Sequence, residues 1–179
     1  MDNIESHLPC LDVTKGGQHI IYDVQDSIKD YMVAVGMNEV INYSFIHPSA
    51  FDKIGLAADD VRRKAIDIMN PITDDFKVMR TTLVPGMLAN VAYNVARQNT
   101  KVATFEVGRI YFADKLPLSG FPTEKPMLCM ALCGKRNELN WNEGREDVDF
   151  YDAKGIVEGL LNNLQLQDWK FTVGSAPYL

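Results

Sequence analysis

Three charged side chains in the middle of the sequence have the types and the spacing that an anion-binding site would need. Arg80 stands just before an expected helix, Arg97 near the end of that helix, and Glu106 on the strand expected after it. Buried charges must be paired, and arginine can pair with glutamate through two parallel hydrogen bonds. The three residues could therefore line one pocket that binds an anionic substrate. They could equally form a structural network that holds the helix to the sheet.

The histidines and cysteines lack the spacing that a metal site or a nucleophilic site needs. His7, His19 and His47 are scattered, and no pair of them stands at a metal-ligand interval. Cys129 and Cys133 lie four positions apart on an expected strand and share one face, but zinc would need two further ligands. A nucleophilic cysteine would need a neighbouring base such as histidine. We therefore interpret both cysteines as small buried apolar side chains.

Two carboxylate-rich segments, Asp74-Asp75 and residues 143–149, carry groups that can hold magnesium or act as acid and base. Short acidic loops are also common on solvated surfaces, and we interpret both segments in that way. No glycine-rich turn joins an expected strand to an expected helix. The sequence therefore contains neither a P-loop nor a dinucleotide-binding fingerprint.

The composition is that of one globular domain. The chain has 179 residues, of which 46% are hydrophobic and 23% charged, enough to bury one sizeable core. Its formal net charge of −6 gives no general attraction for nucleic acid, whose binding domains usually present a basic face. The three cysteines form no disulfide framework, and no apolar run approaches the roughly 20 residues of a membrane helix. We expect a cytoplasmic protein.

The elements that must position these side chains include several helices. Apolar residues recur every three or four positions, which predicts helices at residues 23–35, 83–98 and 150–164, with a shorter one at 49–54. Gly36 is expected to end the first helix, because glycine adopts the left-handed conformation at low cost. Thr82 is expected to cap the second, and Pro85 fits its first turn.

Strands are expected where β-branched and aromatic residues gather, at residues 39–46, 65–69, 103–112, 127–133 and 169–173. Some of these strands follow one another without a helix between them. This order favours an α+β domain with a mostly antiparallel sheet flanked by helices over a doubly wound parallel sheet. Residues 1–17 are polar and non-periodic, so we expect an N-terminal arm or linker there and the folded domain at residues 18–179.

Several motifs in order resemble a known family. The run MRTTLVPGMLANVAYNVARQ at residues 79–98, followed by TFEVGRIYF at 104–112, is similar to the signature of the catalytic-like core (B6–B7) domain of the β subunit of bacterial-type phenylalanyl-tRNA synthetases. IKDYMVAVGMNEVINYSF at 28–45 resembles the first helix and strand of that domain. DFYDAKGIVEGLL at 149–161, with Trp141 before it, resembles a later helix, and residues 2–5 resemble the end of the preceding small domain.

The resemblance implies a fold like the class II synthetase catalytic domain and an (αβ)₂ heterotetramer. In that assembly the α subunit is expected to bind ATP, Mg²⁺ and phenylalanine, and the whole enzyme to bind the phenylalanine tRNA. The β core domain is expected to have kept the fold and lost the chemistry. It would pack on the α subunit and help to form the central helical interface, with no cofactor of its own.

The resemblance also bears on the candidate residues. A class II active site is expected to place an arginine on the α-phosphate from the strand region that residues 105–109 occupy here. The wider catalytic motif of the α subunit is absent, and so is a late arginine motif, because the chain stops first, as a truncated fragment would. We therefore expect no catalytic, cofactor-binding or metal-binding residue. Arg80, Arg97 and Glu106 are expected to be parts of a structural polar network.

Three functions compete at this stage. The first is the scaffold portion of an aminoacyl-tRNA ligase. The second is a free-standing adenylating enzyme that uses Arg80, Arg97, Glu106 and Arg109 around an acyl-adenylate. The third is a regulatory domain that binds a small amino acid in a degenerate pocket. Adenylate formation by the chain alone would favour the second, and stabilisation by phenylalanine but not by alanine would favour the third.

Overall fold

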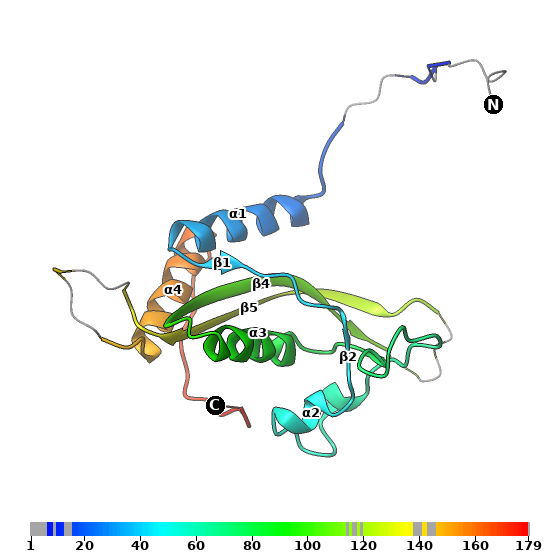
Figure 1. Ribbon diagram of the computed structural model, residues 1–179. Coiled ribbons are helices and arrows are strands. Elements are labelled where there is room, and N and C mark those ends of the chain that lie inside the picture. Colours follow the sequence, from blue (N-terminus) through cyan, green and yellow to red (C-terminus); the bar gives the residue numbers. More distant parts are fainter. Residues whose placement is uncertain are drawn as a thin grey trace.

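A long curved sheet with helices on both faces forms the middle of the molecule (Figure 1). The computed structural model describes residues 7–8, 10–12, 16–113, 115, 118, 120–137, 141–142 and 146–178. The expected arm at 1–17 and the acidic segment at 143–149 lie partly outside the described residues. Residues 2–5 lie wholly outside them.

The sheet is built on two long antiparallel strands. β4 (Lys101–Phe112) pairs with β5 (Thr123–Gly134) along its whole length. β1 (Asn38–Glu39) adds a short parallel strand at the other edge of β4, so that β4 lies in the centre. The mixed α+β class, with its mainly antiparallel pairing, agrees with the expectation from the sequence.

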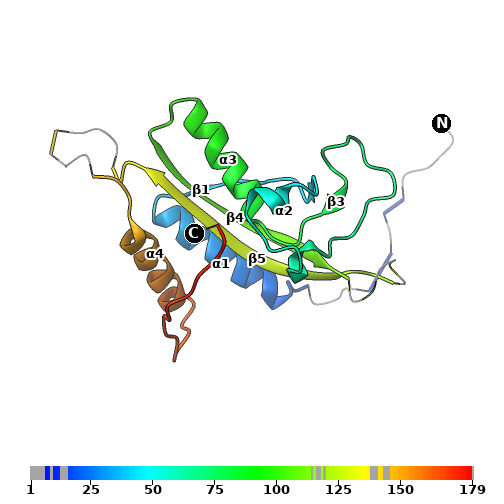
Figure 2. The ribbon, with the colours of Figure 1, turned by 90° about the horizontal axis from the view of Figure 1, so that it is seen from below.

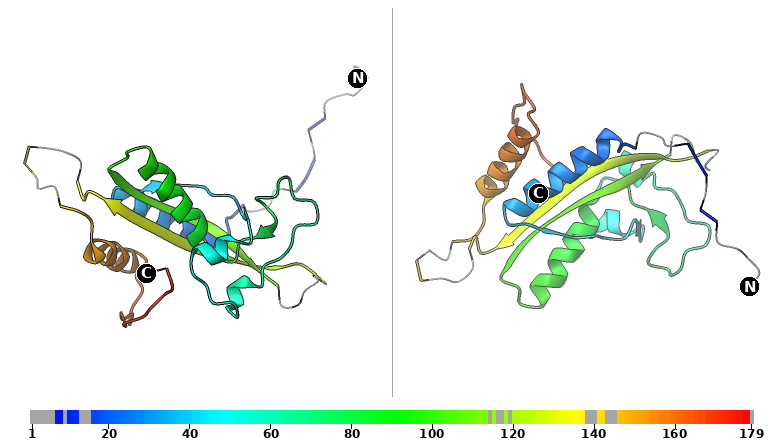
Figure 3. Two further views of the ribbon diagram at one scale, coloured as in Figure 1. Left: turned by 60° about the horizontal axis from the view of Figure 1, so that its bottom comes forward. Right: turned by 90° about the horizontal axis from the view of Figure 1, so that it is seen from above.

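One face of the sheet carries the main apolar core. Phe105 of β4 is fully buried and packs in one cluster with Met32 and Leu160. These two residues come from α1 (Ile20–Ala34) and α4 (Phe150–Asn163), and both helices lie on this side of the sheet (Figure 3). The alternation of side chains along β4 therefore turns its apolar positions toward α1 and α4.

The opposite face is covered by α3 (Val84–Ala96), as Figure 2 shows. Met87 of this helix is buried, and its sulfur accepts a hydrogen bond from the Thr104 hydroxyl at 3.3 Å. Because Thr104 and Glu106 alternate with Phe105, both point to the α3 side. This face thus receives the polar side chains of the central strand.

A second, smaller core lies beside the long sheet. It is built from the antiparallel pair β2 (Phe45–Ile46) and β3 (Val78–Met79), the short helix α2 (Ala50–Lys53) and the 3-10 turn η1 (Val61–Arg63). Its buried residues are Phe51, Ile54, Leu56, Ala65 and Val78. The two cores are joined through the segments that run from β1 to β2 and from β3 to α3.

The helix predictions are confirmed, with ends displaced by a few residues. Gly36 follows α1 with a φ of 87°, which confirms it as the residue that ends the helix. The prediction that Thr82 caps α3 is wrong, because the N-cap residue is Leu83 and the helix has no side-chain capping bond. The Thr82 hydroxyl only accepts a hydrogen bond from the Val84 N–H at 3.4 Å. No helix in the described ranges is both long and apolar enough to cross a membrane.

Two of the strand predictions hold only in part. The strand expected at 39–46 is interrupted, because only β1 and β2 pair and Ile41 between them is 91% exposed. The apolar alternation there does not mark a buried face. At 65–69, the Asp67–Val78 bridge is held by two backbone hydrogen bonds, from Met79 N–H to the Ile66 oxygen and from Ile68 N–H to the Lys77 oxygen, but the segment forms no longer ladder.

The strand expected at 169–173 is wrong. The described chain forms no ladder there, and the aromatic residues contact other side chains instead. The rings of Trp169 and Phe171 meet edge to face at 5.5 Å, and the Lys154 ammonium lies 5.2 Å from the Phe171 ring centre. Strand-forming residues do not make a strand without a neighbour to pair with.

A glycine sets how closely α1 and α4 approach. The Tyr31 hydroxyl donates a hydrogen bond to the Ile156 carbonyl oxygen at 3.1 Å. A Cβ on Gly159 would lie 2.0 Å from that hydroxyl oxygen, whereas a Cβ on Gly155 would meet nothing within 4 Å. The close contact between α1 and α4 therefore requires a glycine at position 159 but not at position 155.

We predict that Gly159→Ala lowers the free energy of unfolding by about 1–3 kcal/mol, because the new methyl group forces α1 and α4 apart. Gly155→Ala is the matched control. It should raise stability by up to about 1 kcal/mol, since alanine is the better helix former. Urea unfolding of both variants measures the difference. Equal effects of the two substitutions would contradict the close helix contact.

Candidate functional site

A buried ion pair stands on the α3 side of the sheet. The Nη1 atom of Arg80 lies 2.6 Å from the Oε1 atom of Glu106, and only 6% and 3% of the two side chains are exposed. Arg80 comes from the turn between β3 and α3, while Glu106 comes from the centre of β4. The structure thus brings together two of the three charged residues that the sequence singled out.

Further hydrogen bonds hold the pair within the protein. Arg80 donates from Nε to the Arg109 carbonyl oxygen at 2.9 Å and from Nη1 to the Asn42 carbonyl oxygen at 3.3 Å. Asn42 donates from its side-chain amide to Glu106 Oε2 at 2.7 Å. Among the described residues, no buried side-chain nitrogen or oxygen lacks a partner. The arrangement is a closed polar network of three residues.

The backbone leaves room for this network at one glycine. A Cβ on Gly108 would lie 2.5 Å from Arg80 Nη2 and 2.9 Å from Glu106 Oε1. No side chain fits there while the ion pair keeps its place. The glycine in the Phe-Glu-Val-Gly-Arg run therefore belongs to the same structural unit as the two charges.

Arg97 lies apart from the pair. It follows the last turn of α3, is exposed, and its guanidinium carbon stands 3.2 Å from the centre of the Tyr93 ring. Its Nη1 donates to the Tyr93 carbonyl oxygen at 3.2 Å. The residue that completes the network is instead Asn42, which sequence reasoning missed. Its signal was a polar residue between the apolar Ile41 and Tyr43 in an expected strand.

The geometry limits what the pair can do chemically. The charge of Arg80 is neutralised by Glu106, and its Nε and Nη1 atoms donate hydrogen bonds to protein oxygens. An anionic ligand would have to displace a buried carboxylate to reach the guanidinium. Arg109, at the end of the same motif, turns outward and pairs with Glu124 at 3.0 Å on the surface.

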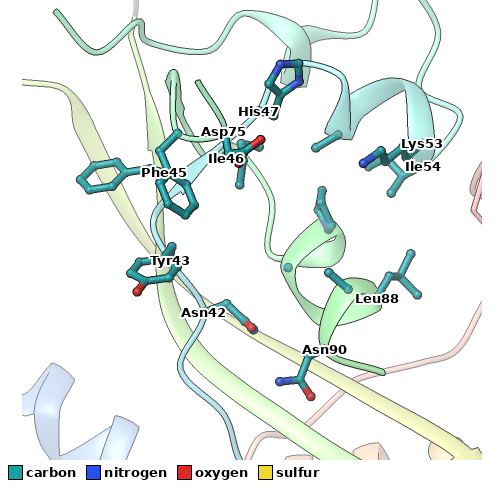
Figure 4. Close-up of a pocket in the computed structure, with 15 residues that line it drawn as sticks. Asn42, Tyr43, Phe45, Ile46, His47, Lys53, Ile54, Asp75, Leu88 and Asn90 are labelled. Carbon is teal, nitrogen blue, oxygen red and sulfur yellow. The ribbon is translucent and has the colours of Figure 1, made fainter. Parts of the chain in front are cut away.

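A cavity of about 580 Å³ opens beside the network (Figure 4). It lies between the segment that holds Asn42, helix α2 and the first turns of α3. Phe45, Ile46 and Phe76 supply much of its apolar wall, and Asn42 is shared between the cavity and the ion pair. The cavity thus combines apolar and polar groups next to the candidate residues.

His19 and His47 act within local turns. The His19 Nδ1 accepts a hydrogen bond from the Ile21 N–H at the start of α1. The His47 Nδ1 lies 2.7 Å from the Ser49 hydroxyl, just before α2. Among the residues that the structure describes, no group of three or more histidine, cysteine, aspartate or glutamate side chains could hold a metal ion.

The neighbouring carboxylates Asp74 and Asp75 make different contacts. Asp74 lies 2.9 Å from the Lys77 ammonium, and the hydrogen bond from Lys77 holds the pKa of the Asp74 carboxyl below its usual range. Asp75 lines the cavity next to it. The two carboxylates therefore have different surroundings.

Cys129 and Cys133 are free thiols on β5, both partly buried. Cys129 stands directly across the strand pair from Glu106. Burial raises the pKa of the Cys129 thiol to about 11, and the negative charge of Glu106 acts in the same direction. A raised pKa keeps the thiol protonated and unreactive at neutral pH.

We predict that Arg80→Met lowers the free energy of unfolding by about 3–5 kcal/mol, because the Glu106 carboxylate is left buried without its partner. Arg109→Met, the same substitution at an exposed ion pair, should cost less than about 1 kcal/mol. Urea unfolding at neutral pH compares them. Near-equal small losses would mean that the buried pair contributes nothing to the fold.

We also predict that iodoacetamide at pH 8 alkylates Cys129 about 100-fold more slowly in the native chain than in urea. The native pKa of about 11 leaves far less thiolate than the ordinary value of 9.0. Peptide mapping by mass spectrometry gives the rate at each cysteine. The urea-unfolded chain is the control, and equal native and unfolded rates at Cys129 would contradict its burial.

The sequence is similar to one family over nearly its whole length. The family model described as the phenylalanyl tRNA synthetase beta chain CLM domain matches residues 4–179. The phenylalanine–tRNA ligase beta subunit of Syntrophotalea carbinolica is 44% identical over 142 residues, covering 78% of this chain and 17% of that protein. The one from Symbiobacterium thermophilum is 33% identical over 180 residues, covering 99% of this chain and 20% of that protein.

The chain thus spans about a fifth of the length of these relatives. Among solved structures, a pyrrolysyl tRNA synthetase of Desulfitobacterium hafniense, PylSc, superimposes with a TM-score of 0.61 at 13% identity, over 87% of this chain and 49% of that one. This likeness shows a synthetase-like fold. The match across residues 4–179 shows that the chain belongs to the phenylalanyl-tRNA synthetase beta chain CLM domain family.

Proposed function

We propose that this chain is the catalytic-like B6–B7 core of a phenylalanine–tRNA ligase β subunit, a class II synthetase fold that supports a catalytic α subunit. On this proposal it forms no adenylate itself. The observation that carries the proposal is the closed network of Arg80, Glu106 and Asn42, which neutralises the buried arginine with a carboxylate of the chain itself.

Adenylate formation needs positive charge that is free to meet the phosphates of ATP. In this chain the central strand presents Glu106 toward the α3 side, and Arg109 turns to the surface beside Glu124. The pairing of Arg80 with Glu106 leaves no uncompensated positive charge in the pair for a phosphate to meet. The arrangement favours a domain that keeps the synthetase fold as a scaffold for another subunit.

The exposed apolar residues support a role in assembly. Val33 of α1 is 57% exposed, and Phe150 and Tyr151 of α4 are 70% and 74% exposed. These side chains offer apolar area that contact with another protein chain or domain would cover. In the proposed enzyme these helices are available for contact with the α subunit or with the rest of the β subunit.

The remaining parts of the proposal concern the whole enzyme. It would attach phenylalanine to its tRNA with ATP and Mg²⁺ bound in the α subunit, as an (αβ)₂ heterotetramer. Residues 18–179 would form the class II core, and residues 1–17 the link from a preceding domain. No cofactor is proposed for the described residues of this chain.

The test is reconstitution with an α subunit. We predict that the full β subunit that contains this chain co-purifies with α, and that the complex catalyses phenylalanine-dependent ATP–pyrophosphate exchange. The 179-residue chain by itself should show none. Arg109→Ala in the complex should change the exchange rate less than about twofold, because Arg109 makes only an exposed ion pair.

A different result would redirect the assignment. Phenylalanine-dependent exchange by the chain alone, lost in Arg109→Ala without unfolding, would favour a free-standing adenylating enzyme. Failure of the β subunit to bind the α subunit would contradict the scaffold role.

A further inference from the structure

The chain that follows α4 crosses the molecule to the smaller core. Figure 1 shows it running from the end of α4 toward α2. Residues 165–175 are exposed throughout, and no backbone hydrogen bond joins residues 167–178 to another described residue. We name residues 165–178 the strap. Because so few contacts hold its middle, its attachment depends on the contacts at its two ends.

The far end of the strap is seated on the smaller core. Tyr178 is partly buried and packs against the same apolar cluster as Ile46 and Val84. Pro177 lies beside Gly55, where a Cβ would stand 3.3 Å from the Pro177 carbonyl oxygen. The φ of Gly55 is 68°, a conformation that glycine adopts at low cost. The end of the strap therefore lies against a position that carries no side chain.

This end is also linked to the turn that carries the buried ion pair. The pKa of the Arg62 guanidinium is raised, mainly by its hydrogen bonds to Asp60 and further by the Tyr178 side chain. The Arg62 carbonyl oxygen accepts a hydrogen bond from the hydroxyl of Thr81. Thr81 is 1% exposed and directly follows Arg80 in the chain. Tyr178 thus contacts the 3-10 turn that supports this segment.

The near end of the strap is fastened to α4 by aromatic contacts. Gln165 and Asp168 have φ angles of 56° and 60°, which residues other than glycine adopt at a cost. After these turns, the Trp169 and Phe171 rings meet edge to face, and the Lys154 ammonium of α4 lies 5.2 Å from the Phe171 ring centre. The left-handed residues can relax when the strap is released, which lowers the cost of its release.

We propose that the strap controls the opening of the smaller core. While Tyr178 is seated, the smaller core is closed; when the strap leaves, this core opens and the main sheet stays folded. The effective concentration of Tyr178 at its seat is set by the length of free chain between it and the Phe171 contact. A partner that displaces Phe171 from α4 would therefore loosen the smaller core at a distance. The inference goes beyond the scaffold role and does not depend on it.

Amide hydrogen exchange of the 179-residue chain, followed by NMR, tests the proposal. The amides of Leu56 and Arg63 report on the smaller core and that of Met37 on the main core, since all three donate backbone hydrogen bonds. We expect Tyr178→Ala to speed exchange about tenfold at Leu56 and Arg63 and less than about twofold at Met37, because only the smaller core loses its cover.

A variant at the other end of the strap separates control at a distance from local packing. Phe171 is not among the described residues packed on the smaller core. Phe171→Ala lengthens the free chain from residues 171–178 to residues 164–178. This doubling lowers the effective concentration of Tyr178, and should raise exchange at Leu56, by about threefold. Val173→Ala, at a fully exposed strap position, is the control and should change nothing.

Three results would overturn the proposal. Equal acceleration at Leu56 and Met37 in Tyr178→Ala would mean that the strap contributes only to global stability. No acceleration at Leu56 in that variant would mean that the strap does not close the smaller core. No effect of Phe171→Ala at Leu56 would reduce Tyr178 to local packing, and this variant decides the question if Tyr178→Ala does not fold. None of these outcomes bears on association with an α subunit, so the two proposals fail separately.

Discussion

The buried ion pair between Arg80 and Glu106 is the interaction on which the rest of this structure depends. A charge in a protein interior is tolerated only with its partner in place, and here the partner comes from a distant part of the chain. The pair and Asn42 tie together the segment before β2, the turn before α3 and the centre of β4. Gly108 leaves the space in which the charges meet. These contacts join the small core to the long sheet.

The same interaction determines which polar groups the fold presents on the α3 side of the sheet. The sheet and helices superimpose on a pyrrolysyl tRNA synthetase. On the α3 side of the sheet, Arg80 and Glu106 form an ion pair, and Arg80 also donates a hydrogen bond to the Arg109 carbonyl oxygen. The apolar cavity beside them is a distinct feature, with its own charges and its own shape. A shared fold does not by itself carry a shared site, because function depends on the particular side chains that the fold presents.

Two features of the structure could be predicted from the sequence. They are the helices, from the spacing of their apolar residues, and the buried ion pair, from the need to pair buried charges. Apolar spacing located α1, α3 and α4, and the need to pair buried charges linked Arg80 to Glu106. Arg97 could not be placed from spacing, because a long side chain at a helix end can fold back onto its own helix, as it does onto Tyr93. The strand predicted at 169–173 failed because pairing depends on a neighbour, which local sequence does not reveal.

The most direct test of the central claim replaces the ion pair by uncharged groups in the full β subunit. Arg80→Met combined with Glu106→Gln removes both charges while the glutamine can still accept the hydrogen bond from Asn42. If the pair serves the fold alone, the double variant regains most of the stability that the single Arg80 variant loses, and its complex with α exchanges pyrophosphate at a near wild-type rate. A folded double variant whose complex has lost that exchange would contradict the account, because the charges would then be required for the chemistry.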